Sequence, residues 1–355
     1  MPSRSELKER ITFLHNKIAS LDTEQNALKI LANSGYGSIG NQYFRYFQLE
    51  NAEAITLTGQ FVIRYIENEL NGFLNKLIGL EKDRVIILDT DSVVLELSDL
   101  FIDSDIPVED RIDILDNFAK QTVQPHIEKT IKRIETILNS FPKLLSMKRE
   151  IIANKTIVLA KKRYIMNVFD KEGVRFKEAK KKIMGIEAVR SSTPPLCKDM
   201  IKNTLDVFFT SDNEHILNFI EECRRRFFAE EDLAKISFPR GLQSLSDYEN
   251  KTQSIPIHVS AAFAFNKFIK EQNLTKKYEI IKSGEKIKFC YLTIPNPFHS
   301  HVIGWTTTWC PKELELEKFI DKNKHFQVGY LNGIESIITA IGWQTELSSD
   351  LNDMF

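Results

Sequence analysis

Two aspartates one residue apart stand between two short apolar runs. The flanking runs, 85–88 and 93–95, are rich in β-branched residues, as buried strands are. Between them Asp89-Thr90-Asp91-Ser92 is a cluster of small polar residues that suits a tight turn. We therefore expect a β-hairpin over 84–97 with both carboxylates at its tip. Because side chains alternate along a strand, the two carboxylates should point the same way.

Two carboxylates at such a short distance repel each other unless a cation lies beside them. Their oxygens favour a hard ion such as Mg2+, which proteins usually hold with one or two carboxylates and the phosphates of a substrate. A metal site at the hairpin therefore requires a phosphate-bearing substrate. The alternative, a solvated turn, stays open here because Asp-x-Asp also occurs in such turns.

Charge is unevenly distributed along the chain, although the net charge is −1. Residues 81–116 contain 12 Asp or Glu against 3 Lys or Arg, whereas residues 143–182 contain 13 Lys or Arg against 4 Asp or Glu. A basic segment together with a carboxylate cluster suits a protein that holds a polyanion and binds metal at one point along it. Two solvated faces are the alternative.

The composition is that of an ordinary soluble protein, with 42% hydrophobic and 27% charged residues. A length of 355 residues predicts two or three domains. No apolar run is long enough for a membrane span, and the N-terminus lacks the apolar core of a signal peptide. The four cysteines are too scattered for Cys-x-x-Cys metal knuckles, so we expect a cytoplasmic protein without a membrane partner.

A long amphipathic helix is predicted before the hairpin. Apolar residues spaced by four and three form a narrow seam that we expect to pack on one neighbouring helix: Leu7, Ile11, Leu14, Ile18, Leu21 and Leu28. Lys29, Asn33 and Tyr36 follow at i, i+4 and i+7 and share an accessible face. Gly35, Gly37 and Gly40 then weaken the helix end and allow a ligand to approach the backbone.

The remaining pattern predicts a helix over 51–78 that ends at Gly79, and another over 112–138. Strands are expected at 157–159 and 164–169, followed by a mainly helical region with helices over 196–209, 214–228 and 261–272 and a strand at 288–293. Lys161-Lys162-Arg163-Tyr164 lies at the start of the second strand of this pair. Three cations beside an aromatic residue in a basic segment are typical of phosphate contacts.

Three of these features together resemble the family B DNA polymerases. Lys29-Ile-Leu-Ala-Asn33-Ser34-Gly-Tyr36-Gly37 is similar to the motif B helix, K-x-x-x-N-S-x-Y-G. Asp89-Thr90-Asp91-Ser92 resembles motif C, and Lys161–Tyr164 resembles the K-K-x-Y motif near the start of the thumb. Order and spacing agree, and the likeness extends over essentially the whole chain, more loosely after residue 200. It is greatest to the replicative polymerases of T-even-type bacteriophages.

The resemblance implies an α+β fold, the C-terminal part of a right-hand polymerase. Its domains would be the end of the fingers (1–41), most of the palm (42–185), a helical thumb (186–346) and a C-terminal tail (347–355). Residues 182–194 resemble the segment that crosses from palm to thumb.

The resemblance also implies roles for the motif residues. Lys29 would meet the triphosphate of an incoming dNTP, and Asn33, Tyr36 and Gly37 would face the nascent base pair. Asp91 would bridge two Mg2+ ions of a phosphoryl transfer, and Asp89 would tune their coordination.

Further positions would bind DNA or protein partners. Lys161, Lys162, Arg163 and Tyr164 would follow the backbone of the primer–template duplex, and Asp170 would have a supporting role. In the tail, Leu351, Met354 and Phe355 resemble the apolar anchors of peptides that bind a sliding clamp. A disordered tail is the alternative.

One element of the family pattern is missing. The D-x-x-S-L-Y-P-S motif, which carries the second metal-binding aspartate, does not occur in this chain. The resemblance therefore implies the C-terminal subunit of a split DNA polymerase. Its partner would be an N-terminal chain that carries the exonuclease and that aspartate and shares the Mg2+ ions, and without this partner the subunit would be inactive. The alternatives are a non-catalytic, duplex-binding polymerase remnant and a glycosyltransferase, which would share only the Asp-x-Asp hairpin.

Overall fold

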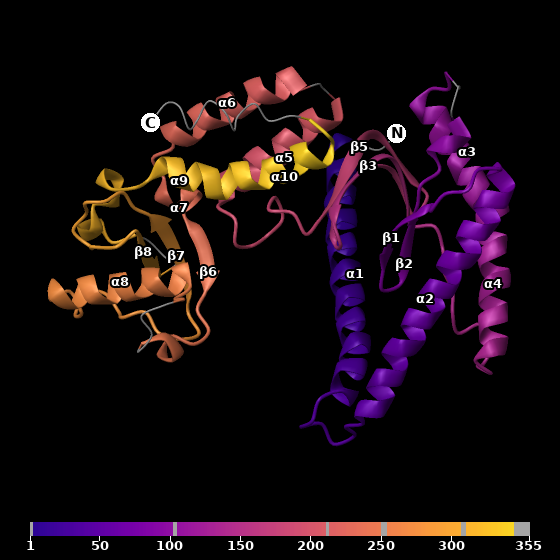
Figure 1. Ribbon diagram of the computed structural model, residues 1–355, viewed down its shortest axis with the longest axis horizontal. Helices are drawn as coiled ribbons and strands as arrows, with labels where there is room; N and C mark the ends of the chain where they lie inside the picture. Colours follow the sequence, from indigo (N-terminus) through magenta and orange to yellow (C-terminus); the bar gives the residue numbers. More distant parts are fainter. Residues whose placement is uncertain (1–2, 102–104, 211–212, 250–253, 307–309, 344–355) are drawn as a thin grey trace. The chain divides into compact units, whose positions relative to one another are not determined.

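The computed structural model describes residues 3–101, 105–210, 213–249, 254–306 and 310–343 of the chain. The fold mixes helices with small antiparallel sheets and is α+β (Figure 1). The chain divides into two compact units, each built from two segments. Unit 1 comprises Met1–Ile106 and Asn117–Lys148, and unit 2 comprises Pro107–Asp116 and Arg149–Phe355.

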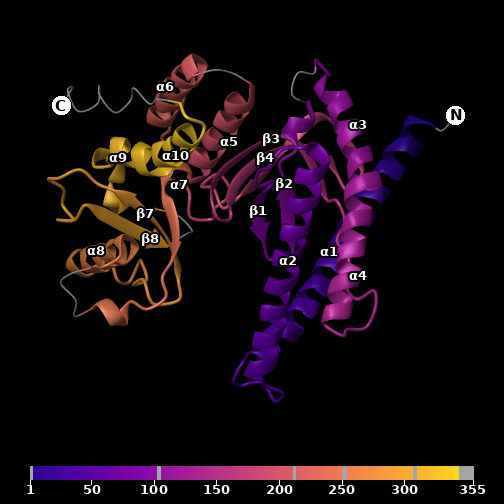
Figure 2. The same ribbon diagram turned by 45° about the vertical axis from the view of Figure 1, so that its right-hand side comes forward.

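Unit 1 is built from long helices and one hairpin. Its elements are α1 (Arg4–Ile39), α2 (Leu49–Ile78), β1 (Val85–Asp89), β2 (Ser92–Leu95), a π-helical turn (Ala119–Val123) and α4 (Gln124–Ile137). Helices α2 and α4 lie side by side (Figure 2). Their buried side chains pack with Val85 of the hairpin into one apolar core, whose helical members include Ile66, Leu70, Leu74 and Ile134. The hairpin therefore rests on a helical layer.

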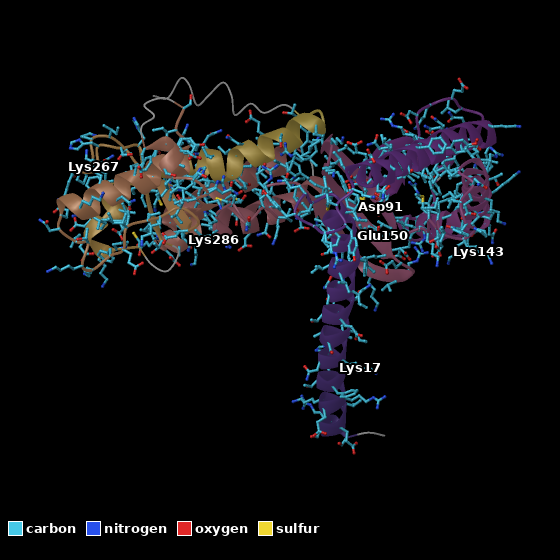
Figure 3. All side chains as sticks on the ribbon, turned by 90° about the horizontal axis from the view of Figure 1, so that it is seen from below. Lys17, Asp91, Lys143, Glu150, Lys267 and Lys286 are labelled. Carbon is cyan, nitrogen blue, oxygen red and sulfur yellow. The ribbon has the colours of Figure 1, made fainter. Side chains whose placement is uncertain are left out.

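Helix α1 begins with a capping box, in which Glu6 N donates to Ser3 Oγ at 3.2 Å and Ser3 N donates to Glu6 Oε2 at 2.7 Å. No residue of this helix is buried in the described part of the chain. The seam predicted to pack on a neighbouring helix is exposed, with Leu14 at 44% and Ile18 at 63% of their full accessibility. Figure 3 shows side chains projecting around α1, near the labelled Lys17. The expected neighbour is not found among the described residues.

The glycines after the seam lie in the last turns of α1, where they were expected. The helix continues through Gly35 and Gly37 and ends only at Gly40. The single-residue cost of a helical glycine, about 1 kcal/mol, is too small to end a helix of this length. The end of α2 was predicted correctly, because Gly79 adopts a positive φ of 75° that favours glycine at a helix C-terminus.

Unit 2 contains two three-stranded antiparallel sheets. The first has the order β3 (Ile151–Ala160), β4 (Arg163–Lys171), β5 (Val174–Met184). The second has the order β6 (Phe238–Gly241), β7 (Lys286–Tyr291), β8 (Val302–Thr306). The sequence patterns predicted β3 and β4 at shorter lengths and β7 two residues too late, but not β5, β6 or β8. Lysines are frequent in β5, which obscures the alternation of a strand.

Helices complete both parts of unit 2. They are α3 (Val108–Phe118), α5 (Pro195–Thr210), α6 (Asn213–Ala229), α7 (Leu233–Ile236), α8 (Ile257–Glu271), α9 (Lys322–Phe326) and, after a π-helical turn (Gln327–Leu331), α10 (Asn332–Ala340). One core joins α5, α6 and α10 to the first sheet through Ile165. A second core lies between α8 and the second sheet and contains Phe265 and Trp305 (Figure 1). Within the described residues, no helix has the length and apolar character needed to cross a membrane.

Candidate metal and nucleic-acid sites

The predicted hairpin is present, and its turn contains the two aspartates. Asp89 is the last residue of β1 and pairs with Ser92, the first residue of β2. Thr90 and Asp91 alone form the loop, in which Asp91 N donates to the carbonyl of Asp89 at 2.7 Å. Asp89 is half-buried, whereas Asp91 is exposed. The Asp91 carboxylate is therefore accessible at the tip of a tight turn.

The turn contains a strained residue. Thr90 has a φ of 56°, in the left-handed region that a β-branched residue rarely adopts. Its hydroxyl donates to Asp89 Oδ1 at 3.0 Å, and Ser92 Oγ donates to the Asp89 carbonyl at 3.2 Å. Glycine is the usual residue where a two-residue turn needs a positive φ. Such strain is found at functional sites when the surroundings enforce it.

The base of the hairpin is anchored by Arg84, whose side chain is fully buried. Its guanidinium donates from Nε to Asn75 Oδ1 at 2.8 Å, from Nη2 to the Leu80 carbonyl at 3.1 Å and from Nη1 to Asp99 Oδ2 at 2.7 Å. The Arg84 backbone N–H also donates to Asn71 Oδ1 at 2.8 Å. One side chain thus links α2 to both ends of the hairpin segment.

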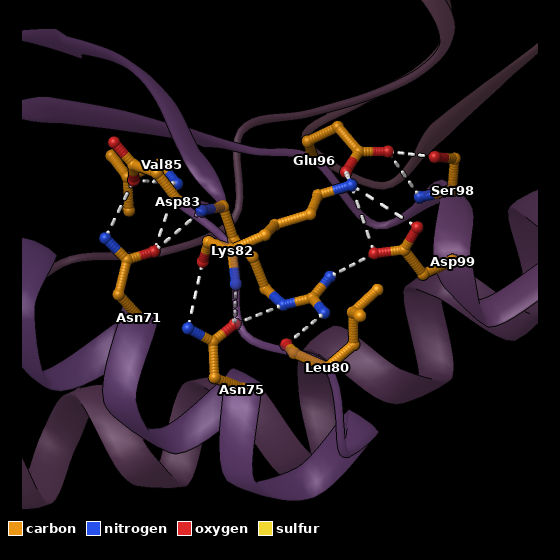
Figure 4. A network of polar contacts seen from close by, with 10 residues as sticks. Asn71, Asn75, Leu80, Lys82, Asp83, Val85, Glu96, Ser98 and Asp99 are labelled. Carbon is orange, nitrogen blue, oxygen red and sulfur yellow. Dashed lines mark hydrogen bonds and ion pairs between the residues drawn. The ribbon is translucent and has the colours of Figure 1, made fainter.

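A second cation extends this network. Lys82 forms ion pairs with Glu96 and, at 3.1 Å, with Asp99, and Glu96 also accepts from Ser98 N at 2.8 Å (Figure 4). The Arg84 and Lys82 side chains hold the pKa of the Asp99 carboxyl below its usual value by hydrogen bonding. The network fixes the strand ends, and therefore the position of the turn, relative to α2. Sequence reasoning missed Arg84, because its only local signal was a cation within an acidic run.

The hairpin fits one part of a magnesium site. Within the described residues, no group of three or more His, Cys, Asp or Glu side chains could hold a metal ion. Two carboxylates at an accessible turn are nevertheless the protein contribution that Mg2+ takes when substrate phosphates and water complete its shell. Asp89 and Asp91 would hold the ion, with further ligands from outside these residues.

The predicted nucleotide face lies on α1. Lys29, Asn33 and Tyr36 are exposed at i, i+4 and i+7 of a continuous helix, with Tyr36 at 44% exposure. In the described part of the chain their side chains have no hydrogen-bond or ion-pair partner. A Cβ added at Gly37 would meet no atom within 4 Å. The helix brings these three side chains together, but no described hydrogen bond or ion pair joins them to the hairpin.

The basic motif forms the hairpin turn between β3 and β4. Lys161 and Lys162 are its two loop residues, and both are exposed. Arg163 is half-buried, and its Nη2 lies 3.2 Å from Glu187 Oε2. Tyr164 is only 7% exposed within β4. The two lysines are thus exposed to solvent, whereas the tyrosine is buried.

Gly185 lies against the Lys161–Lys162 turn and has a φ of 65°. A Cβ at this position would lie 2.2 Å from the carbonyl oxygen of Lys162 and 3.1 Å from Cγ of Arg163. Only glycine allows both this backbone conformation and this close approach. Gly185 therefore sets the position of the Lys161–Lys162 turn, a role that the sequence did not reveal.

Asp170 has no exposed surface. Its carboxylate forms ion pairs with Arg149 and, at 3.3 Å, with Arg175 Nε, and it accepts from Gly173 N at 3.0 Å. Asp116 joins the same cluster through Arg149 Nη2 at 2.8 Å. Asp170 thus holds the β4–β5 turn and α3 together. The predicted tail anchors Leu351, Met354 and Phe355 lie outside the described residues.

Comparison with known proteins identifies the family. The model of DNA polymerase family B matches residues 1–296. The chain belongs to DNA polymerase family B. It is 28% identical to the DNA-directed DNA polymerase of Enterobacteria phage T4 over 96% of its length and 29% identical to that of Escherichia phage RB69 over 94%. It is also 28% identical to the DNA polymerase delta catalytic subunit of Drosophila melanogaster over 52% of its length.

This member of DNA polymerase family B spans only part of its relatives. It covers 39% of the T4 enzyme, 38% of the RB69 enzyme and 15% of the Drosophila subunit. The family and the α+β fold expected from the three motifs are therefore confirmed. The individual roles of the motif residues stay predictions.

Proposed function

We propose that this chain is the C-terminal part of a DNA-directed DNA polymerase and performs template-directed nucleotidyl transfer together with an N-terminal polypeptide. The observation that carries the proposal is the exposed Asp91 carboxylate on an anchored hairpin in a family B chain. In this proposal residues 1–41 belong to the fingers, 42–185 to the palm and 186–346 to the thumb. Primer–template DNA and dNTPs are the substrates, and the host cytoplasm is the location.

In this proposal the hairpin carboxylates hold catalytic metal. Asp91 is the main ligand and Asp89 adjusts its coordination, while the N-terminal polypeptide contributes a further aspartate. Bound Mg2+ supplies charge stabilisation for the attacking and leaving oxygens of phosphoryl transfer. The Arg84 network keeps the hairpin in place, so little reorganisation is needed when substrate binds.

The α1 face is proposed to bind the incoming nucleotide. Lys29 supplies a mobile point charge for the triphosphate. Asn33 and Tyr36 face the nascent base pair, and Gly37 leaves the open space that a base requires. Since these side chains have no partner in the described part of the chain, they are available to a ligand.

The β3–β4 turn is proposed to bind the DNA backbone. Lys161 and Lys162 contact phosphates of the primer–template duplex, and Arg163 adds charge beside them. Tyr164, with little exposed surface, supports the turn from inside the sheet.

The N-terminal polypeptide is proposed to cover α1. The seam of α1 has the four–three spacing that packs on a second helix, and the chain spans only 39% of the T4 relative, so the matching helix would come from the missing part. A sliding clamp is a further proposed partner, through Leu351, Met354 and Phe355 of the tail.

Primer extension tests the catalytic proposal. The chain is mixed with the N-terminal polypeptide from the same source, Mg2+, dNTPs and a primer–template. We expect extension by the mixture and a loss of roughly a thousandfold for Asp91→Ala, because several kcal/mol of charge stabilisation disappear. Asp105→Ala, an exposed acidic residue of the same unit, is the matched control and should extend normally.

Extension that survives Asp91→Ala would refute the catalytic assignment. A mixture that binds duplex DNA but never extends a primer would favour the non-catalytic remnant, in which Lys161 and Lys162 keep their role. The glycosyltransferase hypothesis rested on the hairpin alone, and membership of DNA polymerase family B removes the reason for it.

A further inference from the structure

The chain turns back after α4 and runs along this helix, which leaves a trough between the helix and the returning segment. At one end of the trough, Ser140 N donates to the Glu135 carbonyl at 3.0 Å. At the other end, Gln124 Nε2 donates to the Met147 carbonyl at 2.9 Å. The trough has a volume of about 680 Å3, within the range of ligand pockets in proteins. All of its lining residues belong to unit 1, and none of them is a motif residue.

One buried carboxylate lies in this trough. Glu135 is 8% exposed, and its Oε1 has no hydrogen-bond partner among the described residues. It stands in the last turn of α4, which contains no basic residue. The C-terminal end of a helix carries a partial negative charge, so it favours a cation rather than a carboxylate. An uncompensated charge at this position is costly, and a cationic group in the trough would offset that cost.

The apolar lining of the trough suits an aliphatic stem. Ile131, Leu145 and Met147 line it beside Glu135. Ile131 is buried, Met147 is half-buried and Leu145 is 37% exposed. Arginine and lysine side chains combine an aliphatic stem with a cationic head. Such a side chain in the trough would place its head on the Glu135 carboxylate and its stem against the apolar residues.

Exposed apolar side chains next to the trough favour a protein ligand over a free amine. Phe141 is 79% exposed, Leu144 is 68% exposed and Ile137 is 54% exposed. A free amine would leave these side chains in water, whereas a protein surface would cover them. Protein interfaces commonly surround a desolvated central contact with neighbours that exclude water.

The charges at the edge of the trough indicate more about the partner. Lys132, Lys143 and Lys148 also line it, and all three are exposed. In the described part of the chain no carboxylate pairs with them. Because exposed charges are screened by solvent and salt, they oppose a bound cation less than the buried Glu135 attracts it. Acidic residues on the partner would complement these lysines.

We propose that the trough binds an arginine or lysine side chain of the N-terminal polypeptide, with acidic residues beside it on that partner. The inference rests on the proposed two-polypeptide function and adds a contact site that is separate in sequence from the α1 seam. The N-terminal polypeptide is favoured as the partner because more than half of the T4 relative lies outside this chain, which covers 39% of it.

Removal of the Glu135 charge tests the inference. Glu135→Gln keeps the size of the side chain and removes its charge. The matched control is Glu81→Gln, at an exposed carboxylate of unit 1 that does not line the trough. Calorimetric titration measures association of the full chain with the N-terminal polypeptide, and thermal unfolding of the full chain alone measures its stability.

We expect Glu135→Gln to weaken association roughly 30-fold or more, the loss typical when one partner of a buried charge pair is removed. Glu81→Gln should associate like the unchanged protein. The chain alone should unfold at the same or a higher temperature with Glu135→Gln, because an uncompensated buried charge is removed. A purely structural carboxylate would give the opposite shift. If Glu135→Gln does not fold, Glu135→Met gives the same comparison without the charge.

A small probe tests the cation site itself. Butylguanidinium has the head and stem of an arginine side chain, and butylurea is its neutral counterpart. Butylguanidinium should raise the unfolding temperature of the unchanged chain relative to Glu135→Gln and should compete with the N-terminal polypeptide. Butylurea should do neither. Stabilisation by butylguanidinium without competition would assign the trough to a free amine and would overturn the proposed partner.

Other results separate this inference from the proposed function. Equal association by Glu135→Gln and the unchanged chain would overturn the inference and leave the two-polypeptide function intact. No association by the unchanged chain would reject that function itself, and the inference with it. If Lys132→Ala or Lys143→Ala destabilises the chain only when Glu135 is present, an internal lysine neutralises the carboxylate, and the inference fails.

Discussion

His325 shows how a single buried residue in unit 2 couples stability to pH. The Tyr291 N–H donates to its Nε2 at 2.7 Å, so Nε2 must be unprotonated. The proton is therefore on Nδ1, which donates to the Ile236 carbonyl at 3.1 Å. The ring has no exposed surface, and its burial lowers its pKa from 6.5 to about 4. A proton on Nε2 would bring its N–H group against the Tyr291 N–H, so that two donors would face each other.

The protein should lose stability as the pH falls from 6.5 to about 4. In this window the unfolded chain binds a proton at His325 and the folded chain does not, so the contribution is complete above pH 6.5 and decreases below it. The full loss is roughly 3 kcal/mol. Chemical unfolding followed by tryptophan fluorescence at pH 7 and pH 5 should show about 2 kcal/mol of this loss. His325→Phe should reduce the pH dependence, and His301→Asn, at an exposed histidine, should leave it unchanged.

Gly185 can be tested against a glycine that shares its conformation but not its neighbour. Gly185→Ala should displace the Lys161–Lys162 turn, because the new Cβ would lie 2.2 Å from the Lys162 carbonyl oxygen. We expect a loss of duplex affinity of roughly tenfold, comparable to one phosphate contact at low salt. Gly173→Ala has the same positive-φ strain, about 1 kcal/mol, with no atom within 4 Å. Equal duplex affinity in the two variants would show that the close approach does not position the turn.

At the scale of elements, the β1–β2 hairpin depends on a buried ion pair. Asp99→Ala removes the carboxylate partner of Arg84, whose guanidinium has no exposed surface. Leaving that charge uncompensated should lower the free energy of unfolding by about 3 kcal/mol and expose the hairpin amides to hydrogen exchange. Glu69→Ala, which breaks an exposed pair with Arg133 in the same unit, should cost less than about 1 kcal/mol.

A double variant separates the pair from its surroundings. Arg84→Met combined with Asp99→Ala removes both charges, so part of the stability lost in Asp99→Ala should return. If the double variant is instead less stable by the sum of both single changes, Arg84 and Asp99 act independently and the anchor is not a pair.

Short-range sequence signals correctly predicted the elements whose structure depends on a few neighbouring residues. The Asp89–Ser92 turn and the end of α2 at Gly79 follow from turn and helix-end preferences of a few residues. Strand β5 was missed because five of its eleven residues carry positive charge, which hides the apolar alternation. Gly185 was missed because its partner, Lys162, is distant in the sequence and the contact depends on sheet pairing.

The candidate site residues were likewise predictable where neighbouring residues determine their positions, and were missed or misplaced where tertiary packing does. Motif spacing placed Lys29, Asn33 and Tyr36 on one helix face, as the structure has them. Tyr164 was grouped with the DNA-binding cations, but it lies in a stretch of β4, residues 164–166, that is buried on both faces, and it is only 7% exposed.

At the scale of the whole molecule, α1 is a long helix whose apolar seam is not buried by any described residue. A helix of 36 residues without a buried side chain lacks the packing of an apolar face from which most helix stability in proteins comes. The seam from Leu7 to Leu28 supplies such a face. Under the proposed function, a helix of the N-terminal polypeptide packs on it, and assembly of the two polypeptides should depend on these side chains.

Leu14→Glu should therefore weaken association with the N-terminal polypeptide by about 10- to 100-fold, because burial of one leucine contributes roughly 1.5–3 kcal/mol. Asn16→Glu adds the same charge about 200° around the helix and should have little effect. Calorimetric titration measures the affinity, and primer extension by the mixture should fall in parallel at limiting protein concentration and recover at high concentration. Recovery with concentration separates a docking defect from a catalytic one. Equal weakening by both substitutions would place the interface elsewhere on α1, and no weakening by either would reject the seam as a docking face.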